Sequence, residues 1–388
     1  MTALVSRRRR RSVLMLLVTL LVVGAVPAMG YVGVRAILDS EGGTDAIKDN
    51  LPVTGFPSTP TALLATTDGA GRLTSTTVFV VDPTGSGGSI ISVPVSADYG
   101  LADDRRISLQ GAYSLGGIDE TVLAVESVLG VTVNHYVEAD HSQLAALLSP
   151  LGPIPVDLPG DVAGSGGLPA IPAGAAELDA DQAAQVLTSL PPADGTGLEA
   201  SRRPNVEETW VGVVRAIGSG SNTINVDSAI EPVSFQDVVD RVFTGTAQTR
   251  GLVAQALTVE QNPTGMDVEQ LDRSEAVFVF ASIAPGAVSA AADGPTYRLV
   301  APPGFDAAVK TTINRMLFVQ SNVLSVDTTG VPQPNTVFLV PDEVVRAEAQ
   351  QTDGIFGDFT FGEPTERIDG IEVTIILGTD YLERTAAT

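Results

Sequence analysis

The residue types that most often carry enzyme chemistry give this chain few specific signals. It has two histidines and no cysteine, so disulfides are excluded and stability must come from packed cores. His135 and His141 are six residues apart, too far for joint metal coordination on one straight strand, and we expect no metal site. The serines lack the histidine and aspartate pattern of serine hydrolases. No glycine-rich phosphate or dinucleotide motif is present.

Three short segments indicate a different chemistry. They are Ser92-Val-Pro-Val-Ser96, which follows a strand-like run, Gln110-Gly-Ala-Tyr-Ser-Leu-Gly-Gly117, and Gly130-Val-Thr-Val-Asn-His-Tyr-Val-Glu-Ala-Asp140. Together they resemble the LytR-CpsA-Psr (LCP) family, membrane-anchored enzymes that transfer glycan phosphates onto bacterial cell-wall polymers. The chain ends with Ile371-Glu-Val-Thr-Ile-Ile-Leu-Gly-Thr-Asp-Tyr381, which is similar to the close of the LytR C-terminal domain. The resemblance therefore implies two domains.

The resemblance also implies a site built for phosphate. The family reaction displaces a polyprenyl phosphate from a pyrophosphate-linked glycan, so it needs arginines near the phosphate oxygens and carboxylates around a divalent cation. Guanidinium groups suit phosphate geometry, and Mg²⁺ prefers oxygen ligands.

Uncharged residues occupy three charged positions of the family pattern. The family loop reads Ser-Ile-Pro-Arg-Asp, whereas Val95 and Ser96 stand here at the arginine and aspartate positions. Thr74 or Ser75 stands where the family has another aspartate. A valine side chain offers neither charge nor donor. We therefore expect a pseudoenzyme, and we assign no catalytic residue.

Other parts of the family pattern survive. Tyr113 matches, Gln110 replaces an asparagine, and Ser108 replaces a lysine. The first arginine of the family's Arg-x-x-Arg-Gln motif corresponds to Arg202 or Arg203. Charged residues after the altered loop offer compensation, although a solvated loop is the simpler interpretation. The candidate ligand-binding residues are Arg105, Arg106, Gln110, Tyr113, Arg202 and Arg203.

The N-terminus predicts a membrane anchor. Arg7 to Arg11 precede an uncharged segment at 12–34, whose 23 residues span roughly 34 Å as a helix, enough for a hydrocarbon core of about 30 Å. The basic run should stay cytoplasmic, giving a single-pass cell-membrane protein with extracytoplasmic C-terminal domains. The alternative is a cleaved signal peptide ending near Val26-Pro-Ala28.

The net charge of the chain indicates which kinds of partner to expect. Without the five N-terminal arginines, 17 basic residues remain against 46 acidic ones, a net charge near −29. Nucleic acid is therefore not an expected partner. Oligomeric state has no sequence signal.

Patterning predicts an α/β fold: an LCP-like mixed sheet flanked by helices, then a small α/β LytR C-terminal-like domain. Short runs rich in Val, Ile and Thr predict strands at 62–66, 76–81, 89–93 and 135–140. Asp119 is expected to cap a helix that Gly130 ends, and 150–174 and 191–197 are expected to be surface loops. The expected domains are a basic tail at 1–11, an anchor at 12–34, a tether at 35–60, the LCP-like domain at 61–283, a linker at 284–295 and the C-terminal domain at 296–388.

Helical apolar stripes predict further packing. Asp179 and Gln182 suit a capping box, and Trp210 belongs to an i, i+4, i+7 stripe that is more typical of a core than of a ligand site. The faces carrying Val122 and Val125, and Trp210 and Val214, are expected either to surround a lipid tunnel or to close a solid core.

We interpret the chain as an LCP-like protein of cell-envelope glycopolymer assembly that binds a polyprenyl-phosphate lipid or a wall glycan without catalysis and without a cofactor. One alternative is a divergent phosphotransferase or pyrophosphatase that uses Mg²⁺, Arg202, Arg203 and the 103–106 loop. Another is a structural scaffold that recruits envelope partners. An arginine and a carboxylate converging beside Val95 would favour the divergent enzyme.

Overall fold

The computed structural model describes residues 51–100, 106–189, 199–218, 232–263, 265–290, 294–341 and 343–387. One compact unit comprises Thr54–Pro364 and Ile368–Thr388; of the second unit, the described residues are Leu51–Val53 and Thr365–Arg367. The predictions for the segments 1–11, 12–34 and 191–197 lie outside the described residues. The predicted domain boundaries stay predictions.

The expected membrane topology needs a correction. Across the described ranges, no helix combines the length and the apolar character needed to cross a membrane. A spanning helix requires about 20 predominantly apolar residues. The prediction of a single-pass cell-membrane protein, and with it the extracytoplasmic placement, is therefore not supported.

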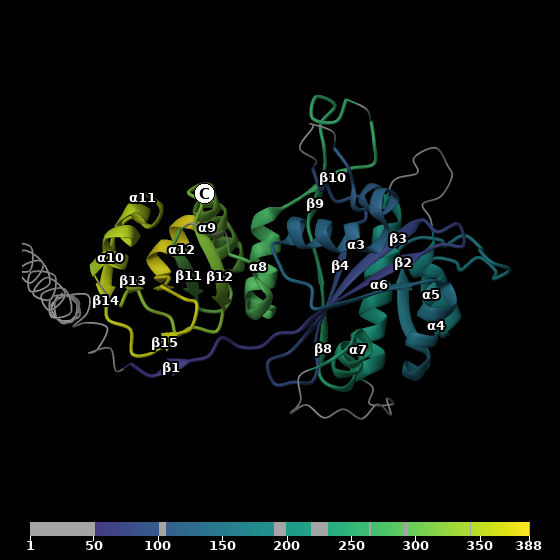
Figure 1. Ribbon diagram of the computed structural model, residues 1–388, viewed down its shortest axis with the longest axis horizontal. Coiled ribbons are helices and arrows are strands. Elements are labelled where there is room, and N and C mark those ends of the chain that lie inside the picture. Colours follow the sequence, from purple (N-terminus) through teal and green to yellow (C-terminus); the bar gives the residue numbers. More distant parts are fainter. Residues whose placement is uncertain are drawn as a thin grey trace, which may run out of the picture. The chain divides into compact units, whose positions relative to one another are not determined.

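The main sheet is mixed, as predicted. Its order is β5-β2-β3-β4-β8, with β3 antiparallel to both β2 and β4 and the outer strands β5 and β8 parallel to their neighbours. All residues of β2, β3 and β4 are buried, because helices cover both faces (Figure 1). The bounds are β2 (Thr61–Thr67), β3 (Leu73–Val81), β4 (Gly88–Val93), β5 (His135–Ala139) and β8 (Ala247–Gly251).

Alternation along β3 assigns its side chains to two cores. Val78 and Val80 pack on the face covered by α3, whereas Phe79 and Val81 pack on the face covered by α4 to α7. Trp210 of α6 meets Phe79 edge to face at a centroid distance of 5.6 Å. The bounds are α3 (Leu109–Leu129), α4 (His141–Leu148), α5 (Ala180–Thr188), α6 (Glu199–Gly218), α7 (Phe235–Thr244) and α8 (Arg273–Ile283).

The helix ends follow local side-chain chemistry. The capping box of Asp179 and Gln182 at α5 is confirmed, and Gly130 ends α3 in the left-handed conformation. The prediction that Asp119 begins the helix is wrong, because Ser108 caps α3 eleven residues earlier and accepts from the Gly111 amide. A kink at Gly117, with φ 67°, separates the two parts of α3.

The predicted surface loop at 150–174 contains a strand. The strands β6 (Ile154–Leu158) and β7 (Gly174–Leu178) form an antiparallel hairpin, and Ile154, Val156 and Leu158 are buried. Helix α6 lies so close that a Cβ on Gly212 would stand 2.6 Å from the Pro155 carbonyl oxygen. The short strands β9 (Ala254–Ala256) and β10 (Glu269–Leu271) form a second antiparallel hairpin.

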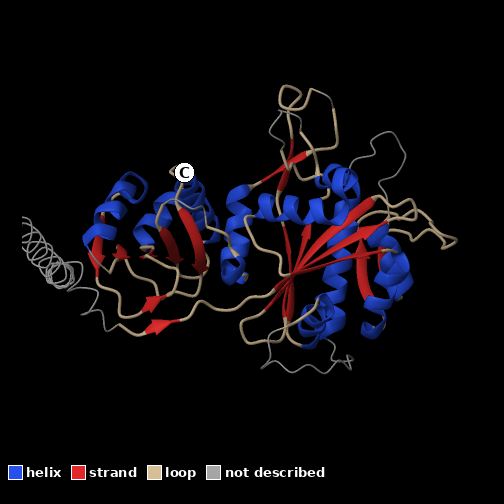
Figure 2. Ribbon diagram, viewed as in Figure 1, coloured by secondary structure: helices blue, strands red, loops and turns tan. Residues whose placement is uncertain are grey.

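A second α/β region follows the first, as predicted (Figure 2). Its sheet has the order β12-β11-β16-β13-β14 and is also mixed. The longest helix of this region, α9, covers Asp306–Phe318. The bounds are β11 (Thr296–Val300), α9 (Asp306–Phe318), β12 (Asn322–Asp327), β13 (Thr336–Leu339), α10 (Glu343–Ala349), α11 (Asp353–Phe356), β14 (Phe359–Gly362), β16 (Val373–Ile376) and α12 (Thr379–Ala386), with 3-10 turns at Ser149–Leu151, Pro285–Ala287 and Gln350–Thr352 and short strands β1 (Val53–Thr54) and β15 (Arg367–Ile368).

Candidate functional site

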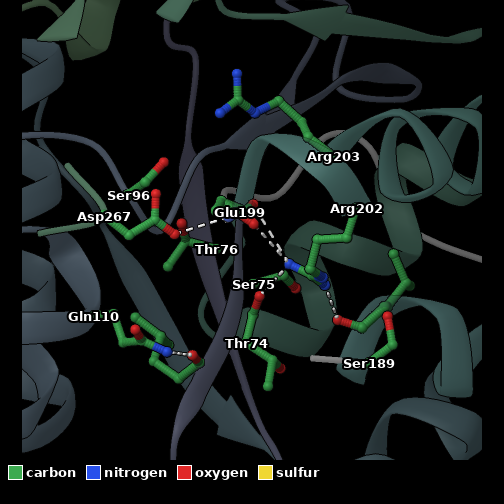
Figure 3. A network of polar contacts seen from close by, with 12 residues as sticks. Thr74, Ser75, Thr76, Ser96, Gln110, Ser189, Glu199, Arg202, Arg203 and Asp267 are labelled. Atoms are coloured by element: carbon green, nitrogen blue, oxygen red, sulfur yellow. Dashed lines mark hydrogen bonds and ion pairs between the residues drawn. The ribbon is translucent and has the colours of Figure 1, made fainter. Parts of the chain in front are cut away.

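Five segments that are distant in sequence meet at one end of the main sheet. They are the start of β3, the loop after β4, the first turn of α3, the first turn of α6 and the start of β10. The first turn of α6 supplies two neighbouring arginines. Because successive helical residues project about 100° apart, Arg202 and Arg203 point in different directions (Figure 3).

Arg202 belongs to a fully buried group, here called the Arg202 cluster. Its Nη1 donates to the Thr74 carbonyl oxygen at 2.5 Å and lies 3.3 Å from a carboxylate oxygen of Glu199. Its Nη2 donates to the Leu187 carbonyl oxygen at 2.9 Å. The Arg202 and Glu199 side chains are 4% and 6% exposed. The Arg202 cluster therefore ties α6 to β3 and to the end of α5.

Burial perturbs both charges of this cluster. Desolvation raises the pKa of Glu199, although the positive charges of Arg202 and Arg203 act in the opposite direction. Desolvation likewise lowers the pKa of Arg202, and the Glu199 carboxylate opposes that shift. Each charge of the Arg202–Glu199 pair thus offsets the desolvation of the other, and removal of either partner would leave a buried charge without its counter-ion.

Arg203 belongs to a second group, here called the Arg203 cluster. Its Nη2 forms an ion pair with Oε2 of Glu269, and the Ser96 hydroxyl donates to the same oxygen at 2.5 Å. The Arg203 and Glu269 side chains are 14% and 9% exposed. The Arg203 cluster therefore brings together the family's altered loop, the first turn of α6 and β10.

Two further carboxylates border the Arg203 cluster. Asp267 accepts a hydrogen bond from the Glu199 amide at 2.8 Å, and Glu207 follows on α6. Burial raises the pKa of both carboxyl groups, and the charge of Arg203 opposes the shift in each case. Within the described residues, no group of three or more His, Asp or Glu side chains is arranged to hold a metal ion.

Hydroxyl groups occupy the position where the family pattern has its first aspartate. Thr66 lies 3.0 Å from the Thr74 hydroxyl and 2.6 Å from the Ser75 hydroxyl, measured between Oγ atoms. Val95, at the family's arginine position, is 5% exposed and packs in the core on the α3 face. These positions hold neutral, internally hydrogen-bonded or apolar groups.

The remaining candidates have different surroundings. Gln110 donates from Nε2 to the Leu73 carbonyl oxygen at 3.0 Å and so ties α3 to β3. The pKa of Tyr113 is raised by burial and by a hydrogen bond with Glu138, which places its hydroxyl at the edge strand β5. Neither side chain contacts the two arginines.

Arg106 lies at the border of the site, whereas Arg105 falls outside the described residues. Arg106 forms an ion pair with Asp98 and donates from Nε to the Gln261 carbonyl oxygen at 2.9 Å. Asp98 belongs to the loop after β4, and its amide donates to the Glu269 carbonyl oxygen. Arg106 therefore connects this loop to the β9–β10 hairpin.

The two histidines face different neighbours. The Nε2 atom of His135 lies 3.4 Å from the Pro232 carbonyl oxygen, and that of His141 lies 3.7 Å from an Asp181 carboxylate oxygen. Trp210 is 1% exposed and packs in the core. Val122, Val125 and Trp210 are buried in the two cores, and Val214 is partly buried against one of them; the expectation of a lipid tunnel between these faces stays a prediction.

An apolar cavity of about 340 Å³ opens elsewhere on the sheet, between α4, α7 and the strands β2 and β5. One lining residue, Ala139, pairs with Thr66, which contacts Thr74 of the polar site. The α7 part of the lining lies toward the opposite end of the sheet, where Arg241 of α7 donates to the Gly85 carbonyl oxygen of the β3–β4 turn. The apolar lining of the cavity consists of Leu64, Val137, Ala139, Ala146, Leu147, Pro150 and Phe235, and its polar lining of Glu138, Gln143, Gln236 and Asp240.

Sequence reasoning missed the acidic half of the site. Glu199, Asp267 and Glu269 were not candidates, and Glu269 lies 173 residues from its partner Ser96. A weak signal exists in the alternation Met266-Asp-Val-Glu-Gln-Leu271, which is typical of a strand that projects both acids to one side. That pattern indicates a strand but not its partner.

The amino-acid sequence is similar to one family model and to one curated protein. Residues 65–186 match the LytR_cpsA_psr family model, which confirms the resemblance over that range. The polyisoprenyl-teichoic acid–peptidoglycan teichoic acid transferase TagV of Bacillus subtilis (strain 168) is 34% identical over 100 residues, covering 25% of this chain and 26% of TagV. The chain thus matches about a quarter of the length of that curated relative.

Three of the solved structures with partial similarity to this chain are those of TagV, TagT and YwtF (TagT). B. subtilis TagV is 18% identical with a TM-score of 0.39 and covers 57% of this chain and 94% of its own. B. subtilis TagT is 18% identical with a TM-score of 0.41 and covers 57% and 88%. The LytR-CPS2A-psr family protein YwtF (TagT) with bound octaprenyl pyrophosphate lipid is 17% identical with a TM-score of 0.38 and covers 56% and 86%.

Proposed function

We propose that this protein, whose residues 65–186 match the LytR_cpsA_psr family model, serves cell-wall glycopolymer assembly by binding a polyprenyl-linked phosphate without transferring it. The relative TagV is named as a transferase of polyisoprenyl-linked teichoic acid. Such a ligand joins a long apolar chain to an anionic head. A protein that binds it needs an apolar cavity next to polar donors.

The absence of transfer is inferred from one observation: both arginines of the site are already paired inside the protein. Arg202 is held by Glu199 and two backbone carbonyls, and Arg203 is paired with Glu269. Phosphoryl transfer requires charge that is preorganised toward the reacting group, and the loss of one such contact typically costs about 10² to 10³ in rate. Val95 and Ser96 supply no replacement charge.

The apolar cavity supports the binding part of the proposal. Its volume of about 340 Å³ lies at the small end of the usual range of about 300 to 1,000 Å³ for ligand sites, so it suits the first prenyl units and not a whole long chain. Each buried methylene contributes about 0.8 kcal/mol. Lipid affinity therefore does not depend on catalytic charges.

The test separates binding from transfer. Full-length protein, in a mild detergent that also disperses the lipid, is incubated with a long-chain polyprenyl phosphate and analysed by native mass spectrometry. A parallel reaction measures Mg²⁺-dependent phosphate release from a polyprenyl pyrophosphate, with TagV assayed alongside. We expect a lipid adduct and no release above the enzyme-free rate.

A matched pair of variants localises the lipid. Leu147 lines the cavity and is partly buried, whereas Leu123 is 55% exposed on α3. Leu147→Asp should weaken lipid binding strongly, because a carboxylate replaces apolar lining, and Leu123→Asp should leave it unchanged. Equal binding by all three proteins would contradict the assigned cavity, and no adduct with any of them would refute lipid binding.

A divergent transferase or pyrophosphatase is the second candidate, and a specific observation favours it. An arginine and a carboxylate do converge beside the altered loop, since Arg203 and Glu269 meet at Ser96. In this alternative, Mg²⁺ would supply the charge that Val95 lacks. Mg²⁺-dependent phosphate release that disappears in Arg203→Ala would support it over the binding protein.

A further inference from the structure

Glu269 makes contacts that a phosphate group would make. Its Oε2 atom accepts from the Ser96 hydroxyl at 2.5 Å and pairs with the guanidinium of Arg203. A short hydroxyl–carboxylate bond and a guanidinium ion pair are the charge-assisted contacts that phosphate oxygens also accept. The Glu269 carboxylate thus occupies the hydrogen-bond donors that a bound anion would use.

The guanidinium of Arg203 keeps unused binding capacity. It contacts Glu269 through Nη2, while its Nε is buried and has no hydrogen-bond partner in the structure. A buried unpaired donor is costly, and a guanidinium is suited to two parallel bonds with one phosphate. A phosphate at this position would use both donors, whereas Glu269 uses one.

Glu269 belongs to a small hairpin. The β9–β10 hairpin has three residue pairs, and the turn between its strands includes exposed residues such as Val259, 81% exposed. Backbone bonds join Glu269 to the loop after β4: its amide donates to the Ser96 carbonyl oxygen and its carbonyl oxygen accepts from the Asp98 amide, each at 2.8 Å. Arg106 also binds the Gln261 carbonyl oxygen of the turn, and Asp267 accepts from the Glu199 amide, so withdrawal of the carboxylate requires the short hairpin to release these contacts together.

The local charge balance also disfavours an added anion while Glu269 is present. Glu199, Asp267 and Glu269 face the two guanidinium groups of Arg202 and Arg203. Negative groups outnumber positive ones, so an approaching phosphate meets net repulsion. Glu207 adds a fourth carboxylate near Arg203, so neutralising Glu269 would reduce that excess and would release Arg203, the more exposed of the two arginines.

We propose that Glu269 is the specificity-determining residue of this site: it occupies the anion position formed by Arg203 and Ser96 and excludes phosphate until the β9–β10 hairpin withdraws it. The inference rests on the proposed function, because it assumes that the ligand of this site carries a phosphate. It adds a residue that decides when the phosphate enters.

The experiment compares two charge-neutralising variants of one hairpin. Glu269→Gln removes the charge at the site and keeps the side-chain shape. Glu260→Gln makes the same change in net charge at an exposed position of the connecting turn. Inorganic pyrophosphate is titrated into the full-length wild type and each variant by isothermal calorimetry, with the thermal midpoint recorded for each protein.

We expect Glu269→Gln to bind pyrophosphate at least about tenfold more tightly than the wild type, the factor that corresponds to 1.4 kcal/mol. Glu260→Gln should match the wild type, and Glu269→Gln combined with Arg203→Gln should lose the gain. Unchanged affinity in a folded Glu269→Gln protein would overturn the proposal. An equal gain in Glu260→Gln would do the same, since it would show an effect of net charge alone.

A measurement on the unmodified chain covers the case in which Glu269→Gln does not fold. Addition of a polyprenyl phosphate should raise amide hydrogen exchange at residues 267–271, because the hairpin must move for the phosphate to enter. Lipid binding without that change would refute the role of Glu269 but leave the proposed function intact. Pyrophosphate binding gained by Glu269→Gln, with no lipid bound by any form, would refute lipid binding but leave the role of Glu269 intact.

Discussion

Arg202 and Arg203 are adjacent in the chain, yet their clusters differ in what holds them. The Arg202 cluster uses two backbone carbonyl oxygens, from Thr74 and Leu187, as well as one carboxylate. The Arg203 cluster uses side chains only, from Ser96 and Glu269. Backbone acceptors move only when the fold moves, whereas side chains exchange partners easily. The Arg202 cluster is therefore architectural, and the Arg203 cluster is able to change with ligand.

The largest expected effect tests the architectural role. Arg202→Ala leaves the Glu199 carboxylate and two carbonyl oxygens buried without their partner, so it should lower the free energy of unfolding by about 3 to 5 kcal/mol. Arg203→Ala should cost less, about 1 to 2 kcal/mol, because Glu269 keeps its bond from Ser96. Urea denaturation of both variants measures the difference. Equal losses would mean that the two clusters do not differ in kind.

A smaller loss of stability is expected when the Ser96 hydroxyl is removed from the Arg203 cluster. Ser96→Ala removes one hydrogen bond to a charged acceptor, and it should lower the free energy of unfolding by about 1.5 kcal/mol. Ser75→Ala offers a matched control, since that hydroxyl contacts neutral Thr66 and its loss should cost about 1 kcal/mol or less. A larger loss for Ser75→Ala would show that the charged contact is not the stronger one.

The smallest effect concerns pH. Burial raises the folded-state pKa of Glu207 above its ordinary value of 4.5, so the folded protein binds more protons than the unfolded chain just above that pH. Its contribution to stability is therefore fully present below about pH 4.5 and is lost as pH rises through the folded pKa. Denaturation at several pH values should show a shallower decline for Glu207→Gln than for wild type. Identical pH dependence of stability in the two proteins would mean that the Glu207 carboxyl group is solvated in the folded state.

The fold was largely predictable from local pattern. β-branched runs identified β2, β3, β4 and β5 to within a few residues, because strand propensity and two-sided burial act over short stretches. The start of α3 was misplaced, since Gly117 interrupts a helix that Ser108 begins. The β6 strand was missed because its Pro155 and flanking glycines are typical of loops.

The site was predictable only in part. The altered loop and both arginines were candidates because a family pattern marks them. Glu269 belongs to no such pattern, and a short three-residue strand carries no information about its partner. Pairing between distant segments depends on tertiary packing, so only the folded structure reveals that Ser96 and Arg203 share one carboxylate.

The long sequence separations in the site also bear on how the protein is made. Arg202 finds the Thr74 carbonyl across 128 residues, and Ser96 finds Glu269 across 173. During synthesis at roughly 5 to 20 residues per second, the ribosome releases the altered loop many seconds before β10. Arg203 is likewise made before Glu269, so the ion pair between them can form only after the β9–β10 hairpin has been synthesised.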